Sequence, residues 1–303
     1  MPAYFVFGLR IFSEIELPEL LVTEAPEGID VTIRIGAVPG VDADAPHMGP
    51  VAAVGNDGLV LDIEGTARFY VRAGVEIVVE PAPESSSRDI RTYLLGSVLG
   101  GMLCHQRGLL PLHANTIRMG DRAIAFAGQS GAGKSTLAAH FQSKGYDVLG
   151  DDVCVVSFNE SGSPVVYPGI LRLKLWNDAI EALGRNREGL QIISEGTEKY
   201  QYSIAPPTRL LPLPLERMYI LDEKDTAPGS ISRLTGSGAM DAVIGQVYRS
   251  HIPGLIGAMP RHMGLNVRLA KTLSIFRATR RRGFDIFGDE AGKLEQHVLT
   301  GQF

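Results

Sequence analysis

The sequence predicts an α/β protein in two parts, and three observations lead to this fold class. Residues 1–85 contain short runs of β-branched and aromatic residues between turn signals, which is typical of a β-rich module. Residues 86–108 have the apolar spacing of a helix. From about residue 109 the order becomes strand, glycine loop, helix and strand. We therefore expect a small β-rich N-terminal module, a connecting helix, and an α/β domain with a mixed sheet over residues 109–303.

Short strands separated by turns make up the expected N-terminal module. The strand-forming runs are 4–9, 30–35, 59–63, 67–71 and 75–79. The turn formers Asn56-Asp57-Gly58 and Arg72-Ala73-Gly74 lie where hairpins would join neighbouring strands. An antiparallel sheet is the expected result.

The segment 86–108 is expected to form a helix that faces a core. The serines at 85–87 can cap its first turn, and Gly108 can end it. Apolar residues recur every four positions, which places them on one face. These residues are Ile90, Leu94, Val98 and Met102.

The α/β domain is expected to contain a strand over 123–127, a glycine loop, a helix over 134–144 and a strand over 147–149. The further strands expected are 153–158, 165–167, 171–175 and 218–221, with a short helix over 177–184. Residues 267–280 have helical spacing and end in Arg280-Arg281-Arg282. Cations stabilise the C-terminal end of a helix dipole, which is our preferred interpretation of this cluster. A docking patch for an acidic peptide is the alternative.

Composition and charge argue against several classes of protein. Lys and Arg number 29 and Asp and Glu number 34, so the formal net charge of −5 argues against broad nucleic-acid binding. The sequence has no long apolar run that could span a bilayer, and its start lacks the pattern of a signal peptide. Cys104 and Cys154 have no metal-binding spacing. We expect a cytoplasmic protein that binds neither nucleic acid nor a membrane, and homo-oligomers remain open.

The strongest motif is a phosphate-binding loop. Residues Gly128-Gln129-Ser130-Gly131-Ala132-Gly133-Lys134-Ser135 match GxxxxGK[ST], the Walker A pattern, and Thr136 follows. Its glycines let backbone N–H groups form an anion nest at the start of a helix. Lys134 can reach the β- and γ-phosphates and Ser135 can bind Mg²⁺. Glycine is abundant, at 35 of 303 residues, so the alternative is a glycine-rich turn without a ligand.

Two carboxylates and a histidine flank this motif. Asp151 and Asp152 follow the expected strand over 147–149, where one could hold Mg²⁺ and the other accept a proton from an attacking hydroxyl. The alternative is a solvated turn. His113 precedes a strand upstream, and a structural histidine is the alternative there.

The block from His113 through the P-loop to Asp151-Asp152-Val153 resembles the HPr kinase/phosphorylase family, whose catalytic domain is similar to a phosphoenolpyruvate carboxykinase core. The resemblance implies an ATP- and Mg²⁺-dependent kinase that phosphorylates a serine. It implies that the P-loop binds nucleotide and metal, that Asp151 is the base, and that Asp152 assists with metal or geometry. His113 would lie near the reacting phosphate. We count Lys134 with the catalytic residues.

The sequence also departs from that family. Thr136 stands where the family usually has glutamate, and its second signature is not visible. The layout, including Leu17-Pro18-Glu19-Leu20 and Tyr93-Leu94-Leu95-Gly96, is more similar to the HPr-kinase-like tailoring kinases of lasso-peptide biosynthesis. That resemblance implies a serine of a ribosomal precursor peptide as the acceptor. An HPr-type phosphocarrier kinase/phosphorylase, a small-molecule P-loop kinase and a nucleotide-binding regulator are the alternatives.

Other side chains have two interpretations each. Arg172 and Lys174 share one face of an expected strand and could steady a triphosphate, or form a solvated face. Lys199 and Arg209 could close over a ligand or be ordinary surface residues. Trp176 is interpreted as a packing anchor rather than a base-stacking residue.

Overall fold

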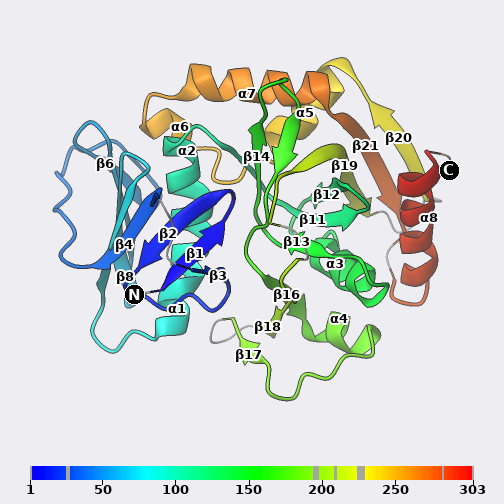
Figure 1. The fold of residues 1–303 in the computed structure, drawn as a ribbon, viewed down its shortest axis with the longest axis horizontal. Helices are drawn as coiled ribbons and strands as arrows, with labels where there is room; N and C mark the ends of the chain where they lie inside the picture. Colours follow the sequence, from blue (N-terminus) through cyan, green and yellow to red (C-terminus); the bar gives the residue numbers. More distant parts are fainter. Residues whose placement is uncertain are drawn as a thin grey trace.

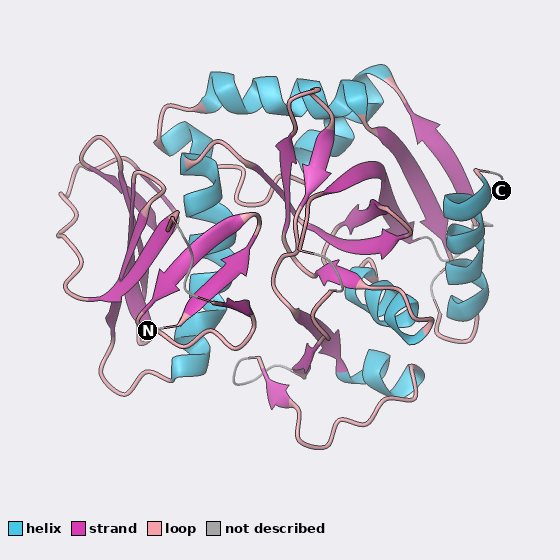
Figure 2. Ribbon diagram, viewed as in Figure 1, coloured by secondary structure: helices cyan, strands magenta, loops and turns pink. Residues whose placement is uncertain are grey.

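The computed structural model describes residues 2–24, 28–193, 198–207, 210–223, 229–281 and 283–301. It is a mixed α/β protein with several sheets (Figure 1). A mixed N-terminal sheet lies beside a long helical segment, and a second mixed sheet with helices on both faces follows (Figure 2). None of the helices in these ranges combines the length and apolar character needed to cross a bilayer.

The N-terminal sheet has nine strands in the order β3-β1-β2-β4-β9-β8-β7-β6-β5. Both predicted hairpin turns are found, between β6 and β7 and between β8 and β9. The expectation of an antiparallel sheet is wrong at β4, which is parallel to β2 and β9. Neither of these pairs is joined by a hairpin, and only longer connections allow parallel pairing. The strands are β1 (Ala3–Val6), β2 (Leu9–Ser13), β3 (Leu21–Thr23), β4 (Val31–Ile35), β5 (His47–Met48), β6 (Val51–Val54), β7 (Gly58–Ile63), β8 (Ala67–Arg72) and β9 (Glu76–Pro81).

The predicted connecting helix is present as α1 (Ser87–Tyr93), the π-helix η1 (Leu94–Leu103) and α2 (Cys104–Gln106). Ser86 caps it, because its side chain accepts a hydrogen bond from the Asp89 N–H. Every residue of η1 is buried. A Cβ atom at Gly100 would lie 3.1 Å from Val153, so the helix closely approaches the residue that precedes β14. The helix therefore packs against both parts of the chain.

The second sheet has the strand order β10-β14-β15-β19-β12-β11-β13, and β21 pairs with β19 and β20. Its centre is parallel, because β19 runs parallel to both β12 and β21. Antiparallel strands surround this centre, as the predicted mixed sheet requires. The strands are β10 (Leu110–Leu112), β11 (Ala114–Met119), β12 (Arg122–Gly128), β13 (Val148–Gly150), β14 (Cys154–Phe158), β15 (Pro164–Val166), β19 (Leu213–Glu223), β20 (Ser230–Leu234) and β21 (Ser274–Arg280).

Helices cover both faces of this sheet. α3 (Lys134–Ser143) and α8 (Phe287–Thr300) pack on the face that carries Phe126 and Tyr219. α5 (Gly236–Gly245) and α7 (Met259–Thr272) pack on the face that carries Ala125 and Met218. This alternation is what a strand buried on both faces requires. A short α6 (Ile252–Leu255) precedes α7.

A small third sheet lies beside the P-loop helix, with the order β16-β18-β17. Its strands are β16 (Arg172–Trp176), β17 (Gln191–Ile192) and β18 (Lys199–Ser203), and α4 (Asn177–Ala182) follows β16. β16 continues the predicted strand at 171–175, and α4 matches the predicted short helix.

The expectation of a helix over 267–280 is wrong in its second half. α7 ends at Thr272, and residues 274–280 form β21, parallel to β19. The apolar run around Leu273, Ile275 and Phe276 is compatible with both helical and strand periodicity. Pairing with the central strand β19 therefore decides that it forms a strand. Arg280 therefore ends a buried strand rather than a helix.

Replacing Leu99 by Ala should strongly destabilise the protein. Leu99 is fully buried in η1, within the core that η1 shares with the N-terminal sheet. Removing a buried leucine leaves a cavity and costs about 2–5 kcal/mol in the free energy of unfolding. Urea unfolding measures this loss. Val22→Ala is the control, because Val22 is 72% exposed on the edge strand β3, and it should change stability by less than about 0.5 kcal/mol.

Candidate functional site

The predicted P-loop joins a strand to a helix, as its chemistry requires. β12 ends at Gly128 and α3 begins at Lys134. Gly131 has a φ of 89° and Gly133 a φ of 74°, in the left-handed region that glycine adopts without strain. A Cβ atom at Gly128 would lie 2.7 Å from the Leu221 carbonyl oxygen of β19. Two constraints therefore require glycine here: backbone conformation within the loop and close packing against β19.

Lys134 lies under the loop. Its Nζ donates hydrogen bonds to the carbonyl oxygens of Gly128 at 2.8 Å and Gln129 at 3.0 Å. Asn115 of β11 donates to the Lys134 carbonyl oxygen. Burial lowers the pKa of Lys134, and the charges of Asp151 and its neighbour oppose this effect. The ammonium group is thus held within the loop by backbone oxygens.

Asp151 is buried beside the first turn of α3. One carboxylate oxygen accepts a hydrogen bond from the Ser135 hydroxyl at 3.0 Å, and the other accepts from the Lys174 N–H at 3.0 Å. Burial raises the pKa of Asp151, and the charge of Asp152 raises it further. The carboxylate connects β13, α3 and β16, so the alternative of a solvated turn is wrong for this residue.

Asp152 points to the other side of the same turn. Its φ is 74°, which is strained for a residue other than glycine. Its carboxylate lies 2.6 Å from Lys174 Nζ and 3.6 Å from His113 Nδ1. Burial would raise the pKa of Asp152, but the charge and hydrogen bond of Lys174, with His113 and Arg172, outweigh it, so the pKa is lowered. Asp152 therefore stays ionised at neutral pH.

His113 lies between this turn and the segment after α5. Its ring stacks on Tyr248, with centroids 6.0 Å apart and planes 9° apart. Its backbone N–H donates to the Gln246 carbonyl oxygen at 2.7 Å. Burial lowers the pKa of His113, and Lys134 lowers it further, while Asp152 opposes this. The imidazole is therefore neutral at pH 7.

The two cations of β16 are not a solvated face. Arg172 is only 2% exposed and donates to the Gln201 side chain at 3.3 Å. Burial lowers its pKa, and the charge of Glu19 is the largest effect that opposes this. Lys174 reaches Asp152 as described. Lys174 therefore lines the site, and Arg172 lies close enough for its charge to lower the pKa of Asp152.

Arg280 and Glu223 are site residues that no motif in the sequence indicates. They end the parallel strands β21 and β19 beside the P-loop. Arg280 is 3% exposed, and its Nη2 lies 2.7 Å from the Ala132 carbonyl oxygen and 3.4 Å from the Glu223 carboxylate. Its interpretation as a helix C-terminus is wrong because residues 274–280 form a strand. A strand assignment there would have placed it at the ligand-binding edge of the sheet. Arg209 and Arg282 lie outside the described residues.

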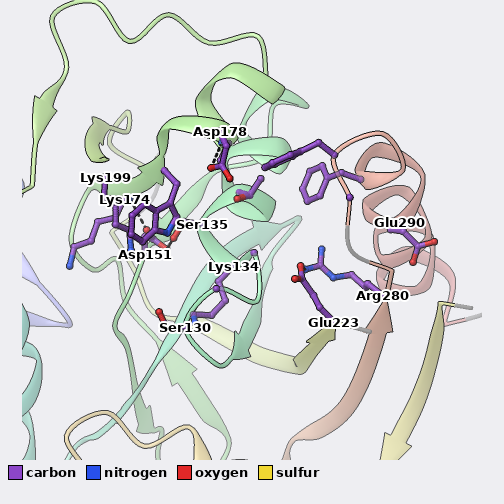
Figure 3. A pocket seen from close by; sticks show the side chains of 18 of the residues that line it. Ser130, Lys134, Ser135, Asp151, Lys174, Asp178, Lys199, Glu223, Arg280 and Glu290 are labelled. Atoms are coloured by element: carbon purple, nitrogen blue, oxygen red, sulfur yellow. Dashed lines mark hydrogen bonds and ion pairs between the residues drawn. The ribbon is translucent and has the colours of Figure 1, made fainter. Parts of the chain in front are cut away.

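The P-loop, the two aspartates, Lys174, Glu223 and Arg280 border one cavity of about 560 Å³ (Figure 3). This size is within the usual range for small-molecule sites. Among the predicted site residues, those that line it are His113, Ser130, Gly131, Gly133, Lys134, Ser135, Thr136, Asp151 and Asp152. Gly128 and Gln129 border a second cavity. Ala132 contributes the carbonyl oxygen bound by Arg280.

Aromatic side chains also line this cavity. Trp176 lies there with 48% of its surface exposed, so its interpretation as a packing anchor is wrong. Lys199 Nζ lies 5.4 Å from the centre of the Trp176 ring. Phe284 is 47% exposed, and Phe287 is its neighbour in the cavity wall. The cavity wall therefore combines a phosphate-binding loop, charged groups and flat aromatic surfaces.

Comparisons with known proteins give little further information. No family model matches the sequence, and no curated protein matches it. Among solved structures, the chain is similar to the Hpr(Ser) kinase/phosphatase from Coxiella burnetii, with a TM-score of 0.31 and 9% sequence identity. That match covers 63% of this chain and 99% of the other. A TM-score this low does not establish a shared fold.

Replacing Lys174 by Met should raise the pKa of Asp152. The substitution keeps an unbranched side chain that is only one atom shorter and removes the charge that most strongly lowers this pKa, so burial then acts with less opposition. Carbon-13 NMR titration of the aspartate carboxyl carbons, with Asp152→Asn to assign the signal, measures the shift. Lys271→Met, an exposed change on α7, is the control. An unchanged Asp152 midpoint in Lys174→Met would contradict the ion pair.

Proposed function

We propose that this protein is an ATP-dependent kinase that transfers the γ-phosphoryl group to a serine hydroxyl of a peptide or small protein. The observation that carries the proposal is that the two neighbouring aspartates, Asp151 and Asp152, direct their carboxylates to different groups. Asp151 bonds to the P-loop serine, while Asp152 faces His113. A phosphate cradle with one carboxylate on its metal side and another toward a possible acceptor is what phosphoryl transfer requires.

The cavity fits a nucleoside triphosphate. Gly131 and Gly133 shape a loop whose amides can bind phosphate oxygens, and Lys134 lies beneath it. Trp176 and Phe284 offer ring faces that a nucleobase can stack on. These features support ATP as the phosphoryl donor.

The residues also fit Mg²⁺. The described residues contain no cluster of three or more His, Cys, Asp or Glu side chains that could hold an ion alone. Mg²⁺ in kinases is held by one or two protein oxygens together with substrate phosphates. The adjacent Ser135 hydroxyl and Asp151 carboxylate supply such oxygens. When bound, the ion would neutralise charge on the transferred phosphoryl group.

The two aspartates are proposed to have distinct roles. From the sequence we expected the base at Asp151 and the metal-side carboxylate at Asp152, but the contacts favour the reverse. The raised pKa of Asp151 would suit a base, yet both its oxygens are already bonded, one of them to the predicted metal ligand Ser135. Reach to the proton decides before pKa does. The lowered pKa of Asp152 makes it a weaker base, but Lys174 binds only one of its oxygens and the other faces His113, so Asp152 is the better placed base.

The reaction follows from these positions. The acceptor hydroxyl passes its proton to the Asp152 carboxylate as its oxygen forms a bond to the γ-phosphorus. The bond between that phosphorus and the β–γ bridging oxygen breaks, and its electrons leave with ADP. Lys134 lies where it can stabilise charge on the phosphates, and neutral His113 can orient the hydroxyl.

The acceptor class rests on the sequence resemblance. It implies a serine of a ribosomal precursor peptide of the lasso type, in the cytoplasm, with an HPr-type phosphocarrier as the alternative. Arg280 does not distinguish between these two acceptors, because it binds the Ala132 carbonyl oxygen of the P-loop.

Replacing Lys134 by Ala should reduce the affinity for Mg·ATP by at least about tenfold, because a charged contact to phosphate is lost. Isothermal titration calorimetry measures this. Lys144→Ala is the matched control: Lys144 is exposed beyond the end of α3 and pairs with Glu295, so its removal should leave the affinity unchanged. Unchanged affinity in Lys134→Ala would contradict the nucleotide site.

Replacing Asp152 by Asn should leave Mg·ATP affinity intact and slow transfer by roughly 10²–10⁴-fold, because the proton acceptor is lost. Replacing Asp151 by Asn should instead weaken the Mg²⁺-dependent part of ATP binding. Titration with and without Mg²⁺, together with transfer of labelled phosphate to a mixed pool of serine peptides, separates the two effects.

The opposite pattern would restore the roles expected from the sequence. In that case Asp151→Asn would bind Mg·ATP normally and lose transfer, while Asp152→Asn would lose Mg²⁺ dependence. A fully active Asp152→Asn protein would remove Asp152 as the base.

A further inference from the structure

A second cavity of about 380 Å³ lies next to the first. Its walls are His113, the start of the P-loop at Gly128 and Gln129, and the segment 245–251, which runs from the last residue of α5 to the start of α6. Apart from His113, the described residues that line it are different from those that line the first cavity. His113 is therefore the boundary between the two.

The segment 245–251 is firmly attached to the P-loop strand and to β10. The Gln246 side-chain oxygen accepts a hydrogen bond from the Gly128 N–H at 2.9 Å. The Tyr248 N–H donates to the Pro111 carbonyl oxygen at 2.9 Å, and the Tyr248 carbonyl oxygen lies 2.8 Å from His105 Nε2. This wall of the second cavity therefore keeps a fixed position relative to the P-loop, which is a requirement for a site that must align a substrate.

Arg249 gives this cavity a positive charge. Its guanidinium donates to the Ser97 hydroxyl at 2.6 Å and lies 5.4 Å from the centre of the Tyr248 ring, and neither partner is an anion. None of the described lining residues is a carboxylate. Burial lowers the pKa of both His113 and His251, so Arg249 is the cation at neutral pH. Arg249 also has a φ of 53°, a strained conformation of the kind found at functional sites.

In-line transfer places the leaving nucleotide and the attacking hydroxyl on opposite sides of the γ-phosphorus, so each needs its own space in the site. The first cavity borders the phosphate-binding part of the P-loop and suits the nucleotide. The second meets it at His113, beside the Asp152 carboxylate. An acceptor bound in the second cavity would therefore adjoin His113, whose Nδ1 lies 3.6 Å from the carboxylate of the proposed base, without occupying the nucleotide cavity.

We propose that the second cavity binds the acceptor, and that Arg249 selects a serine peptide with an Asp or Glu side chain next to the serine. This inference rests on the proposed kinase function. Among the described residues Arg249 contacts a hydroxyl and an aromatic ring rather than an anion, and a guanidinium so placed binds a carboxylate through charge-assisted hydrogen bonds. Acidity beside the serine is thus the chemical feature that the cavity recognises.

The test compares short serine peptides in three pools whose flanking positions are Asp/Glu, Asn/Gln or Lys/Arg. With labelled ATP, the wild-type protein should phosphorylate the acidic pool at least about tenfold faster than the amide pool, which corresponds to ~1.4 kcal/mol. Arg249→Lys should keep this preference, and Arg249→Glu should reverse it toward the basic pool. Arg233→Glu, an exposed change on β20 outside both cavities, is the matched control and should behave as wild type.

A binding measurement separates this inference from the kinase function. The same pools with alanine in place of serine are titrated by fluorescence anisotropy, and Mg·ATP affinity reports whether Arg249→Glu is folded. Tighter binding of the acidic pool to wild type, lost in folded Arg249→Glu, supports the acceptor cavity even if no pool is phosphorylated, which would reject the kinase function alone. Equal binding of acidic and amide pools to wild type, or an unchanged acidic preference in Arg249→Glu, overturns the inference.

Discussion

Two hydrogen bonds to the buried carboxylate of Asp151 hold the site together. A carboxylate that is 2% exposed is costly without partners, so its bonds to the Ser135 hydroxyl and the Lys174 N–H fix how three elements meet. They join the end of β13 to the P-loop helix α3 and to β16. Once these elements are fixed, the next residue has to turn through a left-handed conformation, which directs Asp152 toward Lys174 and His113. The second carboxylate is therefore positioned by the first.

The P-loop is supported from both sides of β12. Asn115 on β11 binds the first residue of the helix, and Arg280 at the end of β21 binds the loop carbonyl at Ala132. Glu223 at the end of β19 pairs with Arg280. Because β19 is parallel to both β12 and β21, the carboxyl ends of all three strands meet at one edge. The charged side chains at this edge are brought together by sheet topology, although they are far apart in the sequence.

Local features of the sequence predicted local structure well. The P-loop motif specified a strand, a turn with left-handed glycines and a helix, and Ser86 marked the helix start. Contacts between distant segments could not be predicted in this way. The strand at 274–280 depends on pairing with β19, and the burial of Arg172 depends on Gln201 and Glu19. Tyr248 and Arg249 reach the site because residues 245–251 bind β10, which no periodic pattern signals.

The strand that follows the carboxylate pair belongs to two hydrophobic cores. Val153 and Val155 pack in the core of the N-terminal sheet and η1, whereas Cys154 and Val156 pack in the core of the second sheet. Asp152 is the neighbour of Val153 in the chain. Packing of Val153 in the core of the N-terminal sheet therefore helps to fix the position of the Asp152 carboxylate relative to the P-loop. The N-terminal sheet is thus part of the framework of the site. Changes in its core must preserve the position of this strand, which limits how far the two halves of the chain can vary independently.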